Sequence, residues 1–199
     1  FNVYFLNSVL VVIPVVICSL FLGILAGFGF AWLKVPGKRV IAAMFALGMV
    51  LPSEAFIIPL YHELRWMGLT NTYLALIIPQ IALSLPFTTL MIASSFQQVP
   101  KELVEAAVMD GASRVKILWG LLVPAIGQTL STLALLLFIW TWNEFLMPLI
   151  LVNKDELRTL PIGMMLFQNR NTIDIPVLMA GAMIVILPLM AVFLLFQRK

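Results

Sequence analysis

The sequence has few of the residues that usually carry out chemistry. It contains one cysteine, Cys18, and one histidine, His62. One cysteine permits no intrachain disulfide and no thiolate metal cluster, and one histidine permits no histidine-based metal site. The phosphate-binding pattern G-x-x-x-x-G-K-[ST] is also absent, so we do not expect this chain to hydrolyse ATP by itself.

Charged residues are scarce as well. They make up 11% of the chain, against about a quarter in a soluble domain, while hydrophobic residues make up 62%. Four runs lack Asp, Glu, Lys and Arg: Phe1–Leu33, Trp66–Pro100, Ile117–Asn143 and Ile175–Gln197. Each is longer than the roughly 20 residues that a helix needs to cross the hydrocarbon core. This distribution predicts an all-α fold, a polytopic transmembrane helical bundle.

Hydrophobic runs separated by polar links predict five spans. They are Val9–Leu33, Val40–Leu60, Tyr73–Phe96, Leu121–Ile150 and Pro176–Phe196. The chain begins at Phe1 without Met, and we expect one leading span to be missing from this excerpt. Prolines recur within or at the edges of the spans: Pro14, Pro52, Pro59, Pro79, Pro86, Pro124, Pro148 and Pro188. Together they favour bent helices around a pathway, although ordinary packing irregularity explains any single one of them.

Basic residues predict the orientation of these spans. One side collects eight: Lys34, Lys38, Arg39, Lys101, Arg114, Lys116, Arg198 and Lys199. The other side has four: Arg65, Lys154, Arg158 and Arg170. Because cytoplasmic loops carry the excess of Lys and Arg, the first side is predicted to be cytoplasmic. The same positions at span ends argue against a nucleic-acid partner, despite a pI of about 9.3.

The predicted cytoplasmic link before the fourth span contains ELVEAAVMDGASRVKILWGLLVPA, a mixture of charged and small residues. Pro100 suits the first position of a helix, and Glu102 and Glu105 are favourable in its opening turns. Gly111 suits the left-handed residue that follows a helix, and Ser113 suits the N-cap of a second short helix. We therefore predict two short helices joined at Gly111.

The small side chains of Ala106 and Ala107 would keep one flank of this segment flat, so that another protein can approach closely. The other explanation is an ordinary amphipathic connector at the membrane surface. On the physical properties of the residues alone, the connector is the favoured explanation.

A longer pattern bears on this choice. The pattern Glu105-Ala106-Ala107, three intervening residues, Gly111, nine intervening residues and then Leu121-x-Val123-Pro124 resembles the EAA signature of binding-protein-dependent ABC importer permeases. That signature has Ile and Leu where this chain has Leu121 and Val123. Further stretches resemble the carbohydrate-uptake subclass, and within it the second permease subunit of maltose-, oligosaccharide- and glycerol-phosphate-type systems. They are NSVLVV (7–12), IIPLYHELRWMGLTNTYLALIIP (57–79), WNEFLMPL (142–149) and TLPIGMMLF (159–167).

The resemblance implies a type I ABC importer transmembrane domain over residues 1–199, with its coupling segment at residues 100–120. In such importers this segment docks into a cytoplasmic ATPase, and closure of the ATPase dimer switches the pathway between its inward- and outward-facing states. Docking would be carried by Glu105, Ala106, Ala107, Asp110 and Gly111.

The implied function is that of a permease subunit in the cytoplasmic (inner) membrane of a prokaryote, importing a sugar, with no catalytic residue of its own. Its partners would be a second permease subunit, the ATPase dimer, an extracytoplasmic sugar-binding protein and membrane lipid. ATP and magnesium would be bound by the ATPase, and this chain would hold no cofactor and no metal. The predicted outer loop, Leu151–Ile175, is the natural surface for the binding protein.

Two intramembrane groups are candidates for the substrate pathway. Glu54 lies near the outer end of the second span, where a charge marks either a pathway or the membrane interface. Gln80 and Ser84 are spaced to share one stripe of the third span, which fits a pathway and interhelical hydrogen bonding equally well.

A third candidate is the aromatic and polar cluster of Trp140, Trp142, Asn143 and Glu144 in the fourth span. Aromatic faces stack on sugar rings, and Asn and Glu can bind sugar hydroxyls. An interfacial aromatic belt with a polar cap would look the same. The sugar-carrying family favours a functional role for Asn143 and Glu144.

Two other functions compete with an importer subunit. An ion-coupled secondary carrier would use Glu54 and Glu144 as proton or sodium sites, but the sequence shows no internal repeat of the kind such carriers have. An intramembrane enzyme would need a nucleophile and base pair or a metal site, and the sequence offers neither.

Overall fold

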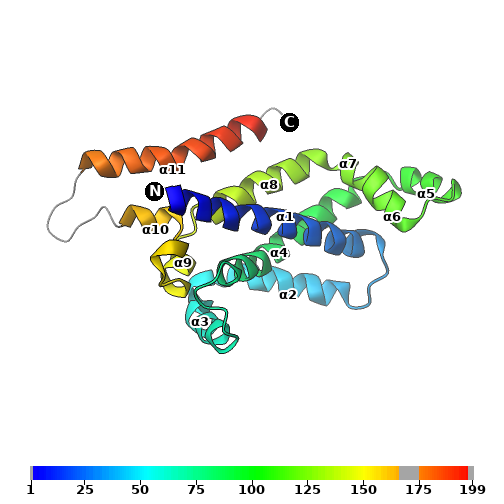
Figure 1. The fold of residues 1–199 in the computed structure, drawn as a ribbon. Coiled ribbons are helices and arrows are strands. Elements are labelled where there is room, and N and C mark those ends of the chain that lie inside the picture. Colours follow the sequence, from blue (N-terminus) through cyan, green and yellow to red (C-terminus); the bar gives the residue numbers. More distant parts are fainter. Residues whose placement is uncertain (1, 166–174, 197–199) are drawn as a thin grey trace. The chain divides into compact units, whose positions relative to one another are not determined.

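The computed structural model describes residues 2–165 and 175–196, and this part of the chain consists of helices and the turns between them, without strands (Figure 1). The elements are α1 (Asn2–Trp32), α2 (Lys38–Val50), η1 (Ser53–Phe56), α3 (Ile57–Trp66), α4 (Leu74–Gln97), α5 (Lys101–Met109), α6 (Arg114–Ile117), η2 (Leu118–Leu122), α7 (Val123–Ala125), α8 (Gly127–Trp142), α9 (Leu146–Leu151), η3 (Asp155–Leu157), α10 (Leu160–Met165) and α11 (Ile175–Phe196). The prediction of an all-α fold is confirmed.

Two helices are long and apolar enough to cross a membrane as single elements. They are α1, with 31 residues, and α4, with 24 residues. At 1.5 Å of rise per residue, both exceed a hydrocarbon core of about 30 Å. They correspond to the first and third predicted spans. The fifth predicted span coincides with α11, which contains Pro188.

The second predicted span is bent. Helix α2 ends at Val50, and the helix that continues from Ser53 to Trp66 lies at 93° to it. Pro52 explains the break, because a proline has no amide hydrogen to donate and disfavours a helical conformation in the residue before it. Leu51 is accordingly extended, with φ −76° and ψ 130°. The range predicted as one span is therefore two helices.

The fourth predicted span is bent as well. The helical segment Arg114–Ala125 meets α8 at 76°, with Ile126 leaving the helical conformation at the bend. Helix α8 then ends at Trp142, eight residues before the predicted end of the span at Ile150, and α9 follows separately. Pro124 supplies no amide hydrogen next to this bend. The breaks at Pro52 and Pro124 agree with the bent helices predicted from the prolines, while the number of spans stays a prediction.

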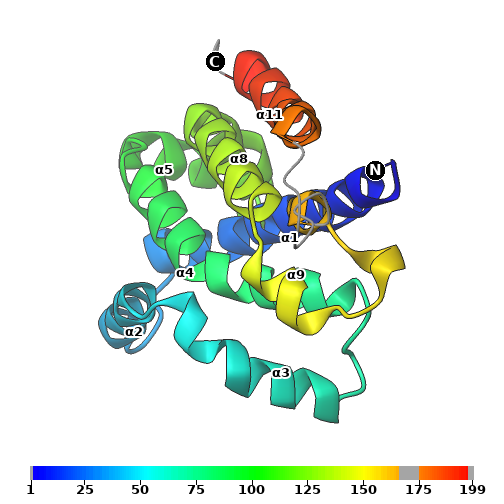
Figure 2. The same cartoon turned by 90° about the vertical axis from the view of Figure 1, so that its left-hand side faces the viewer.

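The chain divides into two compact units, and the division passes through α1, α4 and α8. Unit 1 comprises Phe1–Ile17, Pro52–Ile81 and Leu135–Lys199, and unit 2 comprises Cys18–Leu51 and Ala82–Ala134. In unit 1, α3 packs beside α9 (Figure 2). Its core consists of two buried clusters, one around Val11, Val15, Leu76 and Leu151 and one around Val12, Trp142 and Leu160.

The core of unit 2 joins the helices α1, α4 and α8 to the segment that carries α5 and α6. Its buried residues are Ile24, Ile92, Phe96, Val99, Ile117, Leu118, Leu122, Ile126 and Leu133. Packing between α1 and α4 is close because Gly23 and Gly27 carry no side chain. A Cβ atom added at Gly27 would lie 2.7 Å from Ile92 Cγ2 and 3.1 Å from the backbone nitrogen of Ala93. Gly29, in contrast, has no neighbouring atom within 4 Å of such a Cβ.

Replacing Gly27 by leucine is expected to lower the free energy of unfolding by about 1–3 kcal/mol, because the added side chain overpacks the contact between α1 and α4. The measurement is the midpoint of thermal unfolding of the purified protein in detergent. Gly29→Leu is the matched control in the same helix and should leave the midpoint nearly unchanged. Equal losses in the two variants would contradict the packing that we describe.

Candidate functional site

The segment predicted to couple to another protein forms two short helices in unit 2. Helix α5 begins at Lys101, one residue later than predicted, since Pro100 precedes the helix with an extended ψ of 130°. Ser113 caps α6 as predicted: its Oγ accepts a hydrogen bond from the Lys116 amide at 3.3 Å. Figure 1 shows the two helices following one another in the chain between α4 and α7.

The turn between the helices is built on Gly111, whose φ is +75°. The amide of Gly111 donates to the Val108 carbonyl at 3.0 Å, and the amide of Ala112 donates to the Ala107 carbonyl at 3.0 Å. These two bonds form the Schellman motif that closes a helix through a left-handed residue. The prediction that Gly111 takes this conformation is confirmed. Asp110, the residue before it, is the C-cap of α5.

One side of α5 packs and the other is exposed. Val104, Ala107 and Ala112 rest against the core of unit 2. Glu105 and Ala106 are exposed. Large apolar side chains on α5 and α6 are exposed as well, although such side chains are usually buried. The exposed fractions are 51% for Leu103, 57% for Val108, 86% for Met109 and 67% for Val115. Exposed apolar surface marks protein–protein or membrane interaction sites, and the docking role of this segment stays a prediction.

Of the candidates for the pathway, Ser84 belongs to unit 2, and the others belong to unit 1 but lie on different elements. Glu54 is exposed in η1, directly after the break at Pro52, and Gln80 is buried in α4. Trp140 is half-exposed in α8. Because η1, α4 and α8 are separate elements, the pathway role of these residues stays a prediction.

Asn143 and Glu144 follow the end of α8, and local hydrogen bonds hold both side chains. The Asn143 side-chain amide donates to the Ile139 carbonyl at 2.8 Å, within one helical turn. A carboxylate oxygen of Glu144 accepts from the Met147 amide at 3.1 Å, at the start of α9. Both side chains therefore help to shape the break between α8 and α9.

Trp142 is a core residue. Its side chain is 1% exposed, its Nε1–H donates to the Val185 carbonyl at 3.1 Å, and its ring stacks on that of Phe138 with centroids 5.4 Å apart. A buried ring cannot stack on a sugar, so the aromatic part of the predicted cluster reduces to Trp140.

In the polar pair Gln80 and Ser84 of the third predicted span, Ser84 contributes to the packing of one helix against another. Its hydroxyl lies 2.7 Å from the hydroxyl of Ser19, which joins α4 to α1 within unit 2. This contact supports the interhelical explanation for Ser84.

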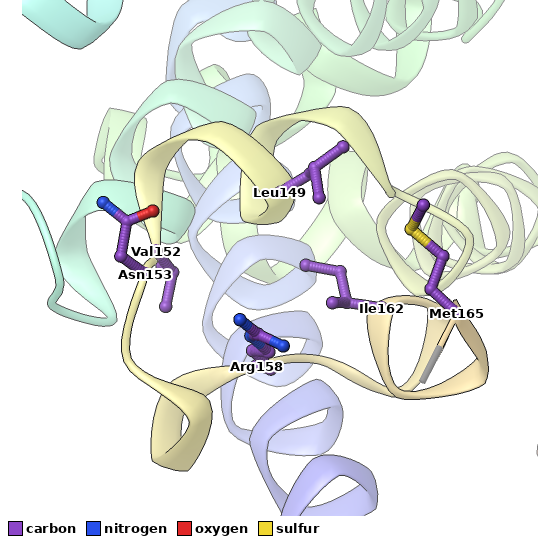
Figure 3. A pocket seen from close by; sticks show the side chains of 6 residues that line it. All are labelled: Leu149, Val152, Asn153, Arg158, Ile162 and Met165. Atoms are coloured by element: carbon purple, nitrogen blue, oxygen red, sulfur yellow. The ribbon is translucent and has the colours of Figure 1, made fainter. Parts of the chain in front are cut away.

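A pocket of about 230 Å³ lies in unit 1, where α9 and α10 meet the segment between them (Figure 3). Its walls are Leu149, Val152, Ile162 and Met165, and its polar groups are Asn153 and Arg158. Arg158 forms an ion pair with Asp155 at 3.0 Å. The remainder of the predicted outer loop, including Asn169, Arg170 and Asn171, lies outside the described residues.

One buried polar centre, Asn7, has no role in the sequence prediction. Its side-chain amide donates to the carbonyls of Glu156 at 2.8 Å and Arg158 at 2.9 Å. Its side-chain oxygen accepts from the Tyr73 hydroxyl at 2.7 Å. Asn7 therefore fastens the start of α1 to the segment that carries Arg158. The signal in the sequence was the polar pair Asn7-Ser8 inside a charge-free run.

A second asparagine, Asn71, supports the same segment. It adopts a left-handed φ of 60°. Its side-chain oxygen accepts from the amides of Asn153 at 2.6 Å and Lys154 at 3.3 Å. Among the described residues no group of three His, Cys, Asp or Glu side chains is placed to hold a metal ion.

Comparison with known proteins gives consistent matches. Residues 19–198 match the family described as binding-protein-dependent transport system inner membrane component. The probable ABC transporter permease protein YurM of Bacillus subtilis is 35% identical over 98% of this chain and 65% of its own length. The trehalose/maltose transport system permease protein MalG of Thermococcus litoralis is 34% identical over 100% of this chain and 72% of its own length.

A further relative is the sulfoquinovosyl glycerol transport system permease protein SmoH of Agrobacterium fabrum, 30% identical over 100% of this chain and 70% of its own. The chain thus spans about two thirds of the length of these relatives. A chain of a bacterial ABC transporter involved in the import of alginate superposes with a TM-score of 0.82. This match covers 100% of this chain and 75% of the other at 22% identity, which establishes the likeness of the folds.

Proposed function

Because the chain belongs to the family of binding-protein-dependent transport system inner membrane components, we propose that it is the permease subunit of an ATP-driven importer that carries a sugar or a related compound inward. The family's description implies a binding protein, and the ABC transporters among its relatives imply an ATPase. We add a second permease subunit as the other half of the pathway. The relatives named for trehalose/maltose and sulfoquinovosyl glycerol support a sugar-like substrate.

The observation that carries the coupling role is the exposed face of α5. Val108 and Met109, three and four residues after Glu105, share its face of α5, and both are exposed. Docking into an ATPase cleft would bury this surface, and each square ångström of apolar area removed from water contributes about 25 cal/mol. Glu105 would fix the register of docking through a charge-assisted hydrogen bond to the ATPase.

The packed side of α5 would transmit a movement of this helix to the rest of unit 2. Val104 and Ala107 rest on the same buried cluster as Phe96 of α4 and Leu133 of α8. Interiors of this kind are close-packed and transmit displacement rather than absorb it. A pull on α5 by the closing ATPase would therefore move the inner parts of α4 and α8 together.

For the substrate pathway we retain Glu54, Gln80, Trp140, Asn143 and Glu144 as the candidate contacts. The polar pocket beside Arg158 lies next to the predicted outer loop and is our candidate surface for the binding protein. The enzyme hypothesis gains no support, since the relatives are named as transport permeases.

The ion-coupled carrier is not supported. The family and its named relatives are binding-protein-dependent and ABC transport components. In the structure, the Glu144 carboxylate accepts a backbone hydrogen bond at the start of α9, and Glu54 lies exposed in η1. Neither position resembles a buried ion site inside a continuous span.

Replacing Glu105 by glutamine should reduce substrate-stimulated ATP hydrolysis of the assembled transporter on the order of tenfold, because a charge-assisted hydrogen bond is roughly twice as strong as a neutral one. The measurement is ATPase activity in vesicles with binding protein and substrate, together with uptake of the substrate. Glu102→Gln is the matched control, since Glu102 is an exposed acid one turn earlier in α5.

We expect Glu102→Gln to retain most of the activity and both variants to insert in the membrane at wild-type levels. Unchanged uptake and ATP hydrolysis in Glu105→Gln would contradict the coupling role. Uptake that follows an ion gradient and persists without any ATPase would contradict the proposed function as a whole.

A further inference from the structure

A cavity of about 420 Å³ lies in unit 2, where α1 ends and where α2 and α5 begin. Lys38, the first residue of α2, and Lys101, the first residue of α5, line it together with Ala31, Trp32 and Gln97. Lys38 and Lys101 are 63 positions apart in the chain. The folding of unit 2 thus brings two cations to one hollow, at the ends of helices that we assign to the membrane.

The cavity has donors but no carboxylate to balance them. Its lining contains no Asp or Glu, and among the described residues neither lysine forms an ion pair. Lys38 Nζ reaches only the Phe30 carbonyl, at 3.4 Å. Ammonium groups form their strongest hydrogen bonds with charged acceptors, so this lining favours an anion such as a phosphate group.

An apolar hollow of about 270 Å³ adjoins the first, since the two share Lys38 and Gln97. Its walls include Phe30, Ala42, Leu90 and Ala93, with Arg39 at its edge. A cationic hollow beside an apolar one matches a molecule with an anionic head and a hydrocarbon tail.

We propose that this double cavity binds an anionic phospholipid, with its phosphate between Lys38 and Lys101 and an acyl chain in the adjoining apolar hollow. The phosphate supplies the negative charge that the lining lacks. The adjoining apolar hollow selects a lipid over a free phosphate, because a free anion leaves that hollow uncovered. Basic pockets at the cytoplasmic membrane surface attract anionic lipids by the same forces.

The test is lipid retention by the full-length protein in detergent, measured by native mass spectrometry during titration with phosphatidylglycerol. We expect Lys38→Gln/Lys101→Gln to weaken retention roughly thirtyfold, which corresponds to about 2 kcal/mol for the loss of two cations. Lys34→Gln/Lys116→Gln is the matched control, because it removes the same charge from the same predicted side outside the cavity. It should change retention less than threefold.

The wild type should also retain phosphatidylglycerol in preference to phosphatidylcholine, because only the first lipid carries a net negative charge for the two lysines. Equal losses in the two double variants, or equal retention of phosphatidylcholine and phosphatidylglycerol by the wild type, would overturn the proposal.

Competition identifies the source of the phosphate. Inorganic phosphate or glycerol phosphate at 10-fold excess should leave phosphatidylglycerol bound, because neither covers the apolar hollow. Complete displacement by these soluble anions would show a site for a free anion and overturn the lipid assignment. None of these measurements depends on transport, so a failure of the lipid proposal would not contradict the proposed function, and a failure of the proposed function would not contradict the lipid proposal.

Discussion

Replacing Gly111 by alanine is expected to reduce substrate-stimulated ATP hydrolysis of the assembled transporter about tenfold, and replacing it by valine should reduce it further. Gly111 has a φ of +75°, and a Cβ atom there would meet nothing within 4 Å. The effect is therefore conformational rather than steric. A left-handed conformation is unfavourable by about 1–2 kcal/mol for most residues and more for a β-branched one.

A graded series makes this prediction specific. Asparagine tolerates the left-handed conformation better than other side chains, so activity should fall in the order Gly, Asn, Ala, Val at position 111. Gly48→Val is the matched control, because Gly48 also has open space around it but lies inside α2 without a positive φ. The measurements are ATPase activity and uptake in vesicles, with membrane insertion checked for each variant.

We expect Gly48→Val to retain nearly full coupling. If Gly111→Val transports and hydrolyses ATP at the wild-type rate, then the turn between α5 and α6 does not set the coupling geometry. A loss of membrane insertion in Gly111→Val alone would point to a role of this turn in folding instead.

Replacing Asn7 by leucine is expected to lower the free energy of unfolding on the order of 3 kcal/mol. The side chain of Asn7 is 3% exposed and makes three hydrogen bonds, to the carbonyls of Glu156 and Arg158 and from the Tyr73 hydroxyl. Leucine is similar in size but leaves these three groups without partners, and each buried unsatisfied group is unfavourable by about 1–3 kcal/mol. The measurement is the midpoint of thermal unfolding in detergent.

A double-mutant cycle tests whether the three groups act together. Tyr73→Phe alone removes one hydrogen bond, and combining it with Asn7→Leu should be less harmful than the sum of the two changes. Asn143→Leu is the control, because Asn143 is exposed and its amide bonds only within its own helix. Additive losses, or an equal loss in Asn143→Leu, would contradict the role of Asn7 in fastening α1 to residues 156–158.

The parts of the site that the sequence predicted correctly depend on neighbouring residues. The left-handed Gly111 and the cap at Ser113 follow from hydrogen bonds that span five residues or fewer. The EAA spacing is likewise confined to about 20 residues. The long apolar helices α1 and α4 follow from runs without charge. Their close approach at Gly27 depends on the position of Ile92, which the local sequence does not show.

The predictions that needed revision depend on residues far apart in the chain. Trp142 belonged to a cluster that could face a sugar or form an interfacial belt, and it is buried instead, with its hydrogen-bond partner Val185 43 positions away. The span through Glu54 is two helices, because Pro52 interrupts the hydrogen-bond pattern that the apolar residues on either side would otherwise continue.

The sequence by itself thus determined that the protein is helical and apolar enough for a membrane, and that its polar segment closes in a turn at Gly111, because hydropathy and helix termination are properties of short stretches. Only the tertiary structure decided that Asn7 holds residues 156 and 158, and that Lys38 and Lys101 share one cavity with Trp32. These partners meet because packing in each unit brings distant segments within a few ångströms, and no local pattern in the chain encodes that proximity.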